Sequence, residues 1–163
     1  MQAPEIEQLL GQMAGALQAS LHLEPLLVGI QTGGVWVAER LHRLLRLPTP
    51  VGRLNIAFYR DDFSRIGLHP QVTPSSLPFA VEDRHIILVD DVLHTGRTVR
   101  AALNEIFDYG RPTSVRLAVL VDRGGRELPV CADVIGTRMS LKPGEHVKLT
   151  GPEPLALEIK TAE

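Results

Sequence analysis

The feature that most constrains this chain is an apolar run followed by two aspartates and a hydroxyl-rich turn. Residues 86–89 are apolar and mostly β-branched, which predicts a strand buried on both faces. Asp90 and Asp91 are expected to end that strand, and residues 93–98 form the turn. Apolar residues then recur at i, i+3, i+4 and i+7, which predicts a helix with one buried face. These positions are Val99, Ala102, Leu103 and Ile106.

This order of elements favours a site for a sugar phosphate. A helix N-terminus offers unpaired N–H donors and the positive end of its dipole, so the turn can hold a phosphate. Thr95, Gly96 and Thr98 can surround a monophosphate. Paired carboxylates repel phosphate unless the ligand also carries vicinal hydroxyls or a divalent cation, and a ribose 5-phosphate meets that condition. The alternative is a helix-capping turn with no ligand.

Longer segments carry a family resemblance. Residues 89–98 closely resemble the phosphoribosyl-pyrophosphate (PRPP) motif of type I phosphoribosyltransferases. Residues 97–105, 108–112 and 117–130 resemble the PyrR family, whose members regulate pyrimidine operons by attenuation and double as uracil phosphoribosyltransferases. The resemblance covers residues 26–136, which is most of the chain.

The resemblance implies an α/β fold of the type I phosphoribosyltransferase kind, with a mainly parallel central sheet flanked by helices. It implies one domain over residues 1–163, with a small hood at about 122–150 that includes N-terminal contributions, and a flexible lid at about 60–82. The alternation of strands and helices independently predicts a parallel sheet with ligands at its carboxyl edge. Helices are expected at 4–22 and 35–46, and strands at 26–30, 51–58, 114–121, 133–136 and 146–149.

The implied reaction converts uracil and PRPP to UMP and pyrophosphate. Asp90 and Asp91 are the candidate catalytic residues, and Mg²⁺ is expected to bind mainly through PRPP, with the same two carboxylates as candidate ligands. The residues that match the PRPP-binding positions are Thr32, Gly33, Gly34, Arg60, Val89, Asp90, Asp91, Val92, Leu93, His94, Thr95, Gly96, Arg97 and Thr98.

The predicted pyrophosphate loop departs from the family pattern. PyrR proteins usually carry an arginine on each side of the threonine, whereas this chain has Gln31 and Gly33 around Thr32. Pyrophosphate contact is therefore expected to depend on the backbone N–H groups of residues 32–34, with less help from cations. A tight turn without a ligand is the alternative for this loop considered by itself.

By the family resemblance, the expected base-binding residues are Val121, which ends the predicted strand 114–121, and Asp122 and Arg123, which follow it. Candidate RNA contacts follow at Arg126, Arg138 and Lys142. Cys131 and Thr137 stand near positions that are basic in RNA-binding members, so RNA binding is expected to be weakened.

Bulk properties fit this interpretation. The chain has 163 residues, a net charge of −2 and one cysteine, which indicates one soluble domain in a reducing, cytoplasmic compartment. No apolar run is long enough to cross a membrane. A homo-oligomer, dimer or higher, is expected from the family. Three alternatives remain open: a phosphoribosyltransferase for another base, a sensor of PRPP or nucleotide, and an RNA-binding attenuator with little catalysis.

Overall fold

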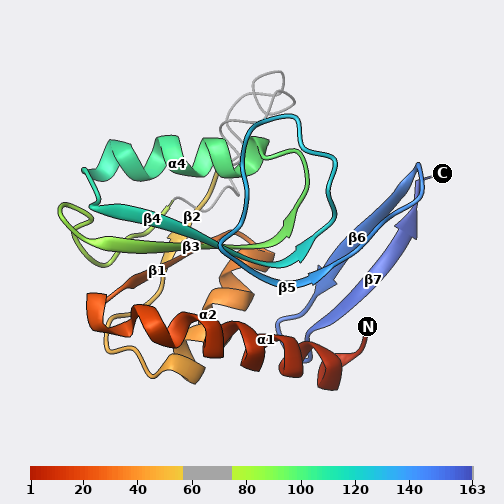
Figure 1. Cartoon of the computed structure of the whole chain (residues 1–163), viewed down its shortest axis with the longest axis horizontal. Helices are drawn as coiled ribbons and strands as arrows, with labels where there is room; N and C mark the ends of the chain where they lie inside the picture. The colour runs from red at the N-terminus through yellow and green to blue at the C-terminus, as the bar shows by residue number, and fades with distance from the viewer. Residues whose placement is uncertain (57–74, 163) are drawn as a thin grey trace.

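The computed structural model describes residues 1–56 and 75–162. Its centre is a parallel five-stranded sheet with the order β2-β1-β3-β4-β5 (Figure 1). The elements are α1 (Ala3–Leu17), the 3-10 helix η1 (Gln18–Leu23), β1 (Leu26–Ile30), α2 (Gly33–Leu45), β2 (Gly52–Leu54), β3 (His85–Leu93), α4 (Arg97–Tyr109), β4 (Ser114–Asp122), β5 (Val134–Arg138), β6 (Glu145–Thr150) and β7 (Ala156–Thr161).

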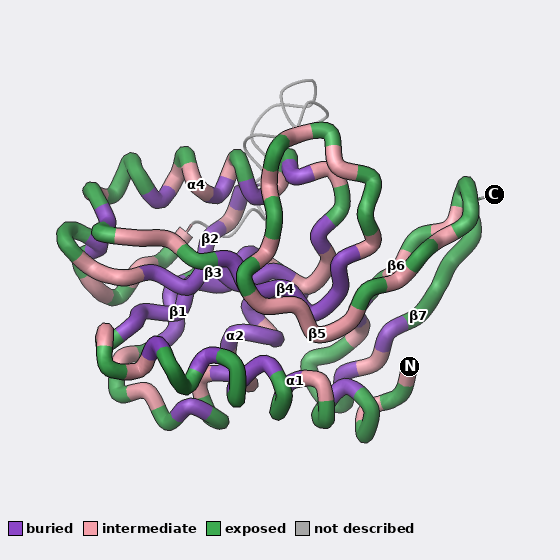
Figure 2. The backbone as a smooth tube through the Cα atoms, viewed as in Figure 1, coloured by how far each residue is buried: buried purple, intermediate pink, exposed green. Residues whose placement is uncertain are grey.

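Helices cover both faces of the sheet. In Figure 1, α4 lies on one face, and α1 and α2 lie on the other. The strand β3 shows why both faces are apolar: Ile87 and Val89 belong to the core on the α1 and α2 side, whereas Ile86 and Leu88 belong to the core beneath α4. Figure 2 shows this buried interior along the strands and the inner sides of the helices. The predicted parallel α/β fold is confirmed.

The strand β3 is longer than the sequence predicted. It continues through both aspartates to Leu93, because Val92 pairs with Val121 and Leu93 pairs with Asp122 on β4. The expected end of the strand before the acidic pair is therefore wrong. The neighbouring strand supplies the hydrogen bonds that offset the poor strand propensity of aspartate.

The C-terminal tail adds a strand that the sequence analysis missed. The strands β6 and β7 form an antiparallel hairpin, seen at one end of the molecule in Figure 1. Leu157 anchors it to the chain start, since its N–H donates to Met1 O (2.9 Å) and its carbonyl accepts from the Met1 ammonium (3.0 Å). Pro152 and Pro154 precede β7 and obscured its short alternating pattern.

Two other predicted elements have different bounds. The α-helix expected over residues 4–22 ends at Leu17, and the 3-10 helix η1 continues the turn to Leu23. The strand expected over 51–58 is described only as Gly52–Leu54, and its last two residues lie outside the described residues.

The predicted lid, residues 60–82, is described only from Ser75 onward. There Ser76 bridges to Arg53 through a pair of backbone hydrogen bonds of 2.8 Å, so this part lies against β2. No helix in the described ranges is long and apolar enough to cross a membrane.

Candidate functional site

The two predicted phosphate loops lie at the same edge of the sheet. The strands β1 and β3 are parallel neighbours, and the helices that follow them, α2 and α4, lie on opposite faces. This is a topological switch point, where parallel α/β sheets leave a crevice outside the carboxyl ends of their strands. Residues 31–34 and 90–98 therefore meet at the place where such folds bind ligands.

The glycines of the first loop contact the acidic pair of the second. A Cβ added to Gly34 would lie 2.6 Å from the carbonyl oxygen of Val89 and 3.2 Å from Asp90 Oδ1. A Cβ added to Gly33 would overlap the carboxylate of Asp91. Only glycine lets the start of α2 come this close to β3, so these two residues bring the loop and the carboxylates into one site.

Local hydrogen bonds hold the two carboxylates. Asp90 Oδ1 accepts from the N–H of Asp91 (2.9 Å), and Asp91 Oδ1 accepts from the N–H of Val92 (2.8 Å). Asp90 is buried, whereas Asp91 is half-buried. The pair thus lies near the end of β3 with one oxygen of each carboxylate held by a backbone N–H, an arrangement that favours electrostatic preorganisation.

A small cavity lies in the turn that follows. It has a volume of about 150 Å³, enough for a phosphate group, and most of it is formed by predicted PRPP-binding residues. Its lining consists of Asp90, Val92, Leu93, His94, Thr95, Gly96, Thr98 and Val99. The N–H of Arg97 donates to Thr95 Oγ1 (3.2 Å), whereas the N–H groups of Thr98 and Val99 have no partner within the helix and can donate to an anion in this cavity.

Two carbonyls of this turn point towards the segment after β4. Leu93 O accepts from Arg123 N (3.0 Å), and Thr95 O accepts from the N–H groups of Glu127 (2.9 Å) and Leu128 (3.1 Å). A trans peptide points its N–H opposite to its carbonyl. The N–H groups of the next residues along the turn are thereby directed away from the segment 123–128.

The predicted base-binding residues occupy the end of β4. The side chain of Val121 is fully buried, and Asp122 is nearly so. The hydrogen bond from Arg126 lowers the pKa of Asp122, and the N–H of Gly124 (3.0 Å) adds to that effect against the opposing influence of burial. Asp122 is therefore a carboxylate at neutral pH, held as an acceptor by its own neighbours.

Arg123 has unused donor capacity. Its Nη2 makes one long hydrogen bond, 3.3 Å, to Glu145 O on β6. Its Nε is buried without a hydrogen-bond acceptor among the described residues. Of the three predicted base-binding residues, this is the one whose polar groups are least satisfied within the protein.

His94 lies exposed among cations. Partial burial lowers its pKa most, and the charges of Arg123, His146 and Arg126 lower it further, while Glu127 opposes them. The imidazole is therefore neutral at pH 7 in the ligand-free protein. A bound phosphate would favour its charged form.

Sequence reasoning missed two features near these loops. Glu127 accepts from Arg97 Nε (3.1 Å) and Nη2 (3.0 Å), which ties the start of α4 to the segment after β4.

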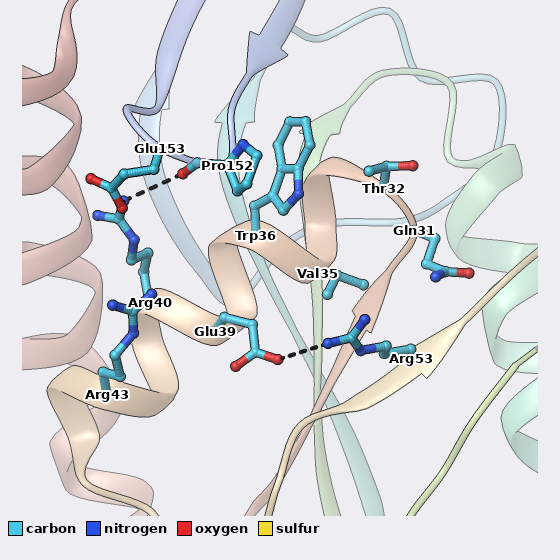
Figure 3. Close-up of a pocket in the computed structure, with 10 residues that line it drawn as sticks. All are labelled: Gln31, Thr32, Val35, Trp36, Glu39, Arg40, Arg43, Arg53, Pro152 and Glu153. Atoms are coloured by element: carbon cyan, nitrogen blue, oxygen red, sulfur yellow. Dashed lines mark hydrogen bonds and ion pairs between the residues drawn. The ribbon is translucent and has the colours of Figure 1, made fainter. Parts of the chain in front are cut away.

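A second cavity of about 480 Å³ lies beside the other loop, lined by Gln31, Thr32 and side chains of α2. Figure 3 shows Trp36 next to Pro152 in this cavity, and Arg53 paired with Glu39. The i, i+3/i+4 spacing of Trp36, Glu39, Arg40 and Arg43 was the available signal.

Other candidate residues are placed differently. Arg60 lies outside the described residues. Arg138 and Lys142 are exposed, whereas Arg126 is half-buried and hydrogen-bonded within the protein. Among the described residues no group of three or more histidine, cysteine or acidic side chains could hold a metal ion without help from a ligand.

Comparisons with known proteins agree with this geometry. The family model for the phosphoribosyl transferase domain matches residues 2–148. The bifunctional protein PyrR of Nitrosococcus oceani is 68% identical over 139 residues, covering 84% of this chain and 78% of that protein. The PyrR protein of Pseudomonas syringae pv. syringae is 56% identical over 164 residues, covering 98% and 96%.

Solved structures share the fold at low identity. The Leishmania tarentolae HGPRT-ase in complex with GMP has a TM-score of 0.66 at 18% identity, covering 85% of this chain and 79% of that one. The hypoxanthine phosphoribosyltransferase of Trypanosoma cruzi has a TM-score of 0.64 at 20% identity, covering 90% and 82%. The type I phosphoribosyltransferase fold is confirmed, and by sequence this chain is a member of the PyrR family.

Proposed function

We propose that the protein is a uracil phosphoribosyltransferase that converts uracil and PRPP to UMP and pyrophosphate. The observation that carries this proposal is the contact between Gly33–Gly34 and Asp90–Asp91. It joins a loop suited to pyrophosphate, a pair of carboxylates suited to ribose hydroxyls and a small phosphate cavity in one crevice. PRPP carries these three groups in that combination.

In this mechanism the protein positions its substrates and stabilises the charge that develops, and no side chain attacks the sugar. The turn 95–98 anchors the 5-phosphate, and backbone N–H groups of residues 32–34 contact the pyrophosphate. Asp90 and Asp91 accept from the ribose hydroxyls and stabilise the positive charge that develops at the anomeric carbon. Holding N1 of uracil over that carbon supplies the remaining rate enhancement. The bond from N1 to the anomeric carbon forms as the bond from that carbon to pyrophosphate breaks, and N1 loses its proton.

Magnesium fits this site only together with its substrate. Mg²⁺ prefers oxygen ligands and is commonly held by one or two carboxylates and substrate phosphates. Asp90 and Asp91 can supply the protein oxygens, and PRPP would supply the others. Bound there, Mg²⁺ would neutralise charge on the leaving pyrophosphate.

Apart from the reacting N1, uracil presents one N–H and two carbonyls, so it needs an acceptor and donors at the end of β4. Arg123 has unsatisfied donors there. Relatives that are 55–68% identical are PyrR proteins, which supports a pyrimidine rather than a purine as the base.

The test is turnover with PRPP and Mg²⁺ on uracil, hypoxanthine, guanine and orotate in parallel. Activity on uracil is expected, and activity confined to another base would overturn the assignment.

We further propose that RNA binding in this chain is weakened, although its relatives are called bifunctional. Of the candidate contacts, Arg138 and Lys142 are exposed, but the guanidinium nitrogens of Arg126 are engaged within the protein. Few free cations among these candidate contacts give few phosphate contacts, so the electrostatic contribution to RNA affinity is expected to be small. Tight, sequence-specific binding of a pyrimidine-operon leader in a gel-shift assay at physiological salt would contradict this.

A further inference from the structure

Arg126 is the side chain that joins the base end of the site to the phosphate end. All its guanidinium nitrogens donate within the protein. Nη2 donates to Asp122 Oδ2, Nη1 to His94 O and Nε to Val130 O, each at 2.8 Å. Asp122 ends β4, whereas His94 opens the phosphate turn after β3, so one planar group connects the two.

The hydrogen bond to His94 O is the middle one of three that the segment 123–128 makes to consecutive carbonyls. The carbonyls of Leu93, His94 and Thr95 all accept hydrogen bonds from the segment 123–128. The donors to the first and third carbonyls are backbone N–H groups, and the donor to the middle one is the Arg126 side chain. Without it, the middle peptide of the phosphate turn loses the hydrogen bond that fixes its orientation.

The orientation of that peptide matters for the ligand. Because the peptide is planar and trans, holding the His94 carbonyl towards Arg126 directs the N–H of Thr95 the opposite way. His94, Thr95 and Gly96 line the small phosphate cavity. The half-buried ion pair with Asp122 holds the guanidinium in place, with side chains only 25% and 11% exposed.

We propose that Arg126 is a positioning residue that couples binding at the base end of the site to binding at the phosphate turn. A base that contacts Asp122 or Arg123 restrains the same guanidinium that orients the turn. This inference rests on the proposed phosphoribosyltransferase function. It also gives Arg126 a role within the protein that differs from the RNA contact expected from sequence.

The test compares the wild type with Arg126→Gln, Arg126→Lys and the control Arg111→Gln, which changes an exposed arginine away from these loops. Titrations with ribose 5-phosphate, uracil and UMP report the two ends separately and together. Arg126→Gln is expected to lower the affinity for ribose 5-phosphate by about tenfold, which is the cost of losing a charge-assisted hydrogen bond. The affinity for UMP is expected to fall by a larger factor than the affinity for ribose 5-phosphate or for uracil. Arg126→Lys is expected to restore part of the lost affinity.

Two further readouts separate positioning from simple damage to the fold. Hydrogen exchange in residues 93–99 is expected to accelerate in Arg126→Gln while the strands β1 and β4 stay protected. In turnover, the KM for PRPP is expected to rise with a smaller change in kcat, because the 5-phosphate lies away from the reacting bond.

The outcomes distinguish the two proposals. Unchanged exchange in residues 93–99 would overturn the positioning role whether or not a ligand binds. Faster exchange with unchanged ribose 5-phosphate and UMP affinity would overturn the coupling and leave Arg126 a purely structural residue. A wild-type protein that binds neither ribose 5-phosphate nor UMP would overturn the proposed function, and the coupling with it.

Discussion

Gly33 leaves room for the carboxylate of Asp91. A Cβ on Gly33 would overlap Oδ2 and Cγ of Asp91 and lie 3.1 Å from its Cβ. The two residues are far apart in sequence, and they join the start of α2 to the end of β3.

Gly33→Ala is therefore expected to harm activity more than stability. The clash is with a short side chain that can rotate, so the fold is expected to survive, but Asp91 must leave its position. A misplacement of about 1 Å in such a site can cost roughly 10²-fold in rate. Steady-state kcat/KM and thermal unfolding measure the two effects. Gly15→Ala, with nothing near its Cβ, is the matched control and is expected to retain full activity.

His94 is expected to report phosphate binding through its titration. Burial and neighbouring cations lower its pKa in the free protein. A phosphate in the adjacent cavity would raise that pKa, so ribose 5-phosphate binding takes up a proton near neutral pH. Proton NMR of the His94 ring, with and without ribose 5-phosphate, measures both values. An unchanged pKa on saturation would show that the phosphate binds elsewhere.

The wild type must also be compared with His94→Gln, because the ligand's own phosphate titrates near pH 6. The difference between the two proteins isolates the contribution of His94. The wild type is expected to gain affinity relative to the variant as the pH falls through the pKa of His94 in the complex. No difference in the pH dependence of affinity would contradict this linkage.

Glu105 on α4 is expected to oppose stability at neutral pH. Burial raises its pKa, and the charge of Asp108 adds to this, while the hydrogen bond from Ser75 opposes them. Its Oε2 is buried without a partner among the described residues. A raised folded-state pKa means that stability falls as the pH rises from below 4.5, the ordinary value, through the folded value.

Glu105→Gln removes that charge and keeps an acceptor for Ser75. It is expected to unfold at a higher denaturant concentration than the wild type at pH 7 and to lose the decline in stability that begins as the pH rises through 4.5, the ordinary value. Chemical denaturation at several pH values measures both. Glu158→Gln, an exposed acidic residue on β7, is the control and is expected to leave the pH profile unchanged. Equal profiles for Glu105→Gln and the wild type would contradict the assignment.

Much of the fold and the main motif could be predicted, because they follow from local patterns. The β-branched run before Asp90 and the helical spacing after Gly96 predict a strand, a turn and a helix in that order. Alternation of such units predicts a parallel sheet whose carboxyl edge carries the loops. These patterns are sufficient to place the acidic pair and the phosphate turn at one edge of the sheet.

What could not be predicted depends on contacts between distant residues. The strand β3 continues past the acidic pair because β4 pairs with it, a tertiary effect that outweighs local propensity. The bond from Arg126 to His94 O spans 32 positions and depends on how the segment after β4 folds back. Periodicity carries no information about such contacts, so the sequence pattern at Arg126 indicates only a solvated cation or an RNA contact.

The most direct test of the account is uracil-dependent formation of UMP from PRPP and Mg²⁺, measured for the wild type and for the double variant Asp90→Asn/Asp91→Asn. Asparagine keeps the oxygen that accepts the backbone N–H groups of Asp91 and Val92, so the double variant is expected to fold. We expect UMP formation by the wild type and its loss in the folded double variant. Retained turnover in the double variant, or no turnover on uracil by the wild type, would contradict it.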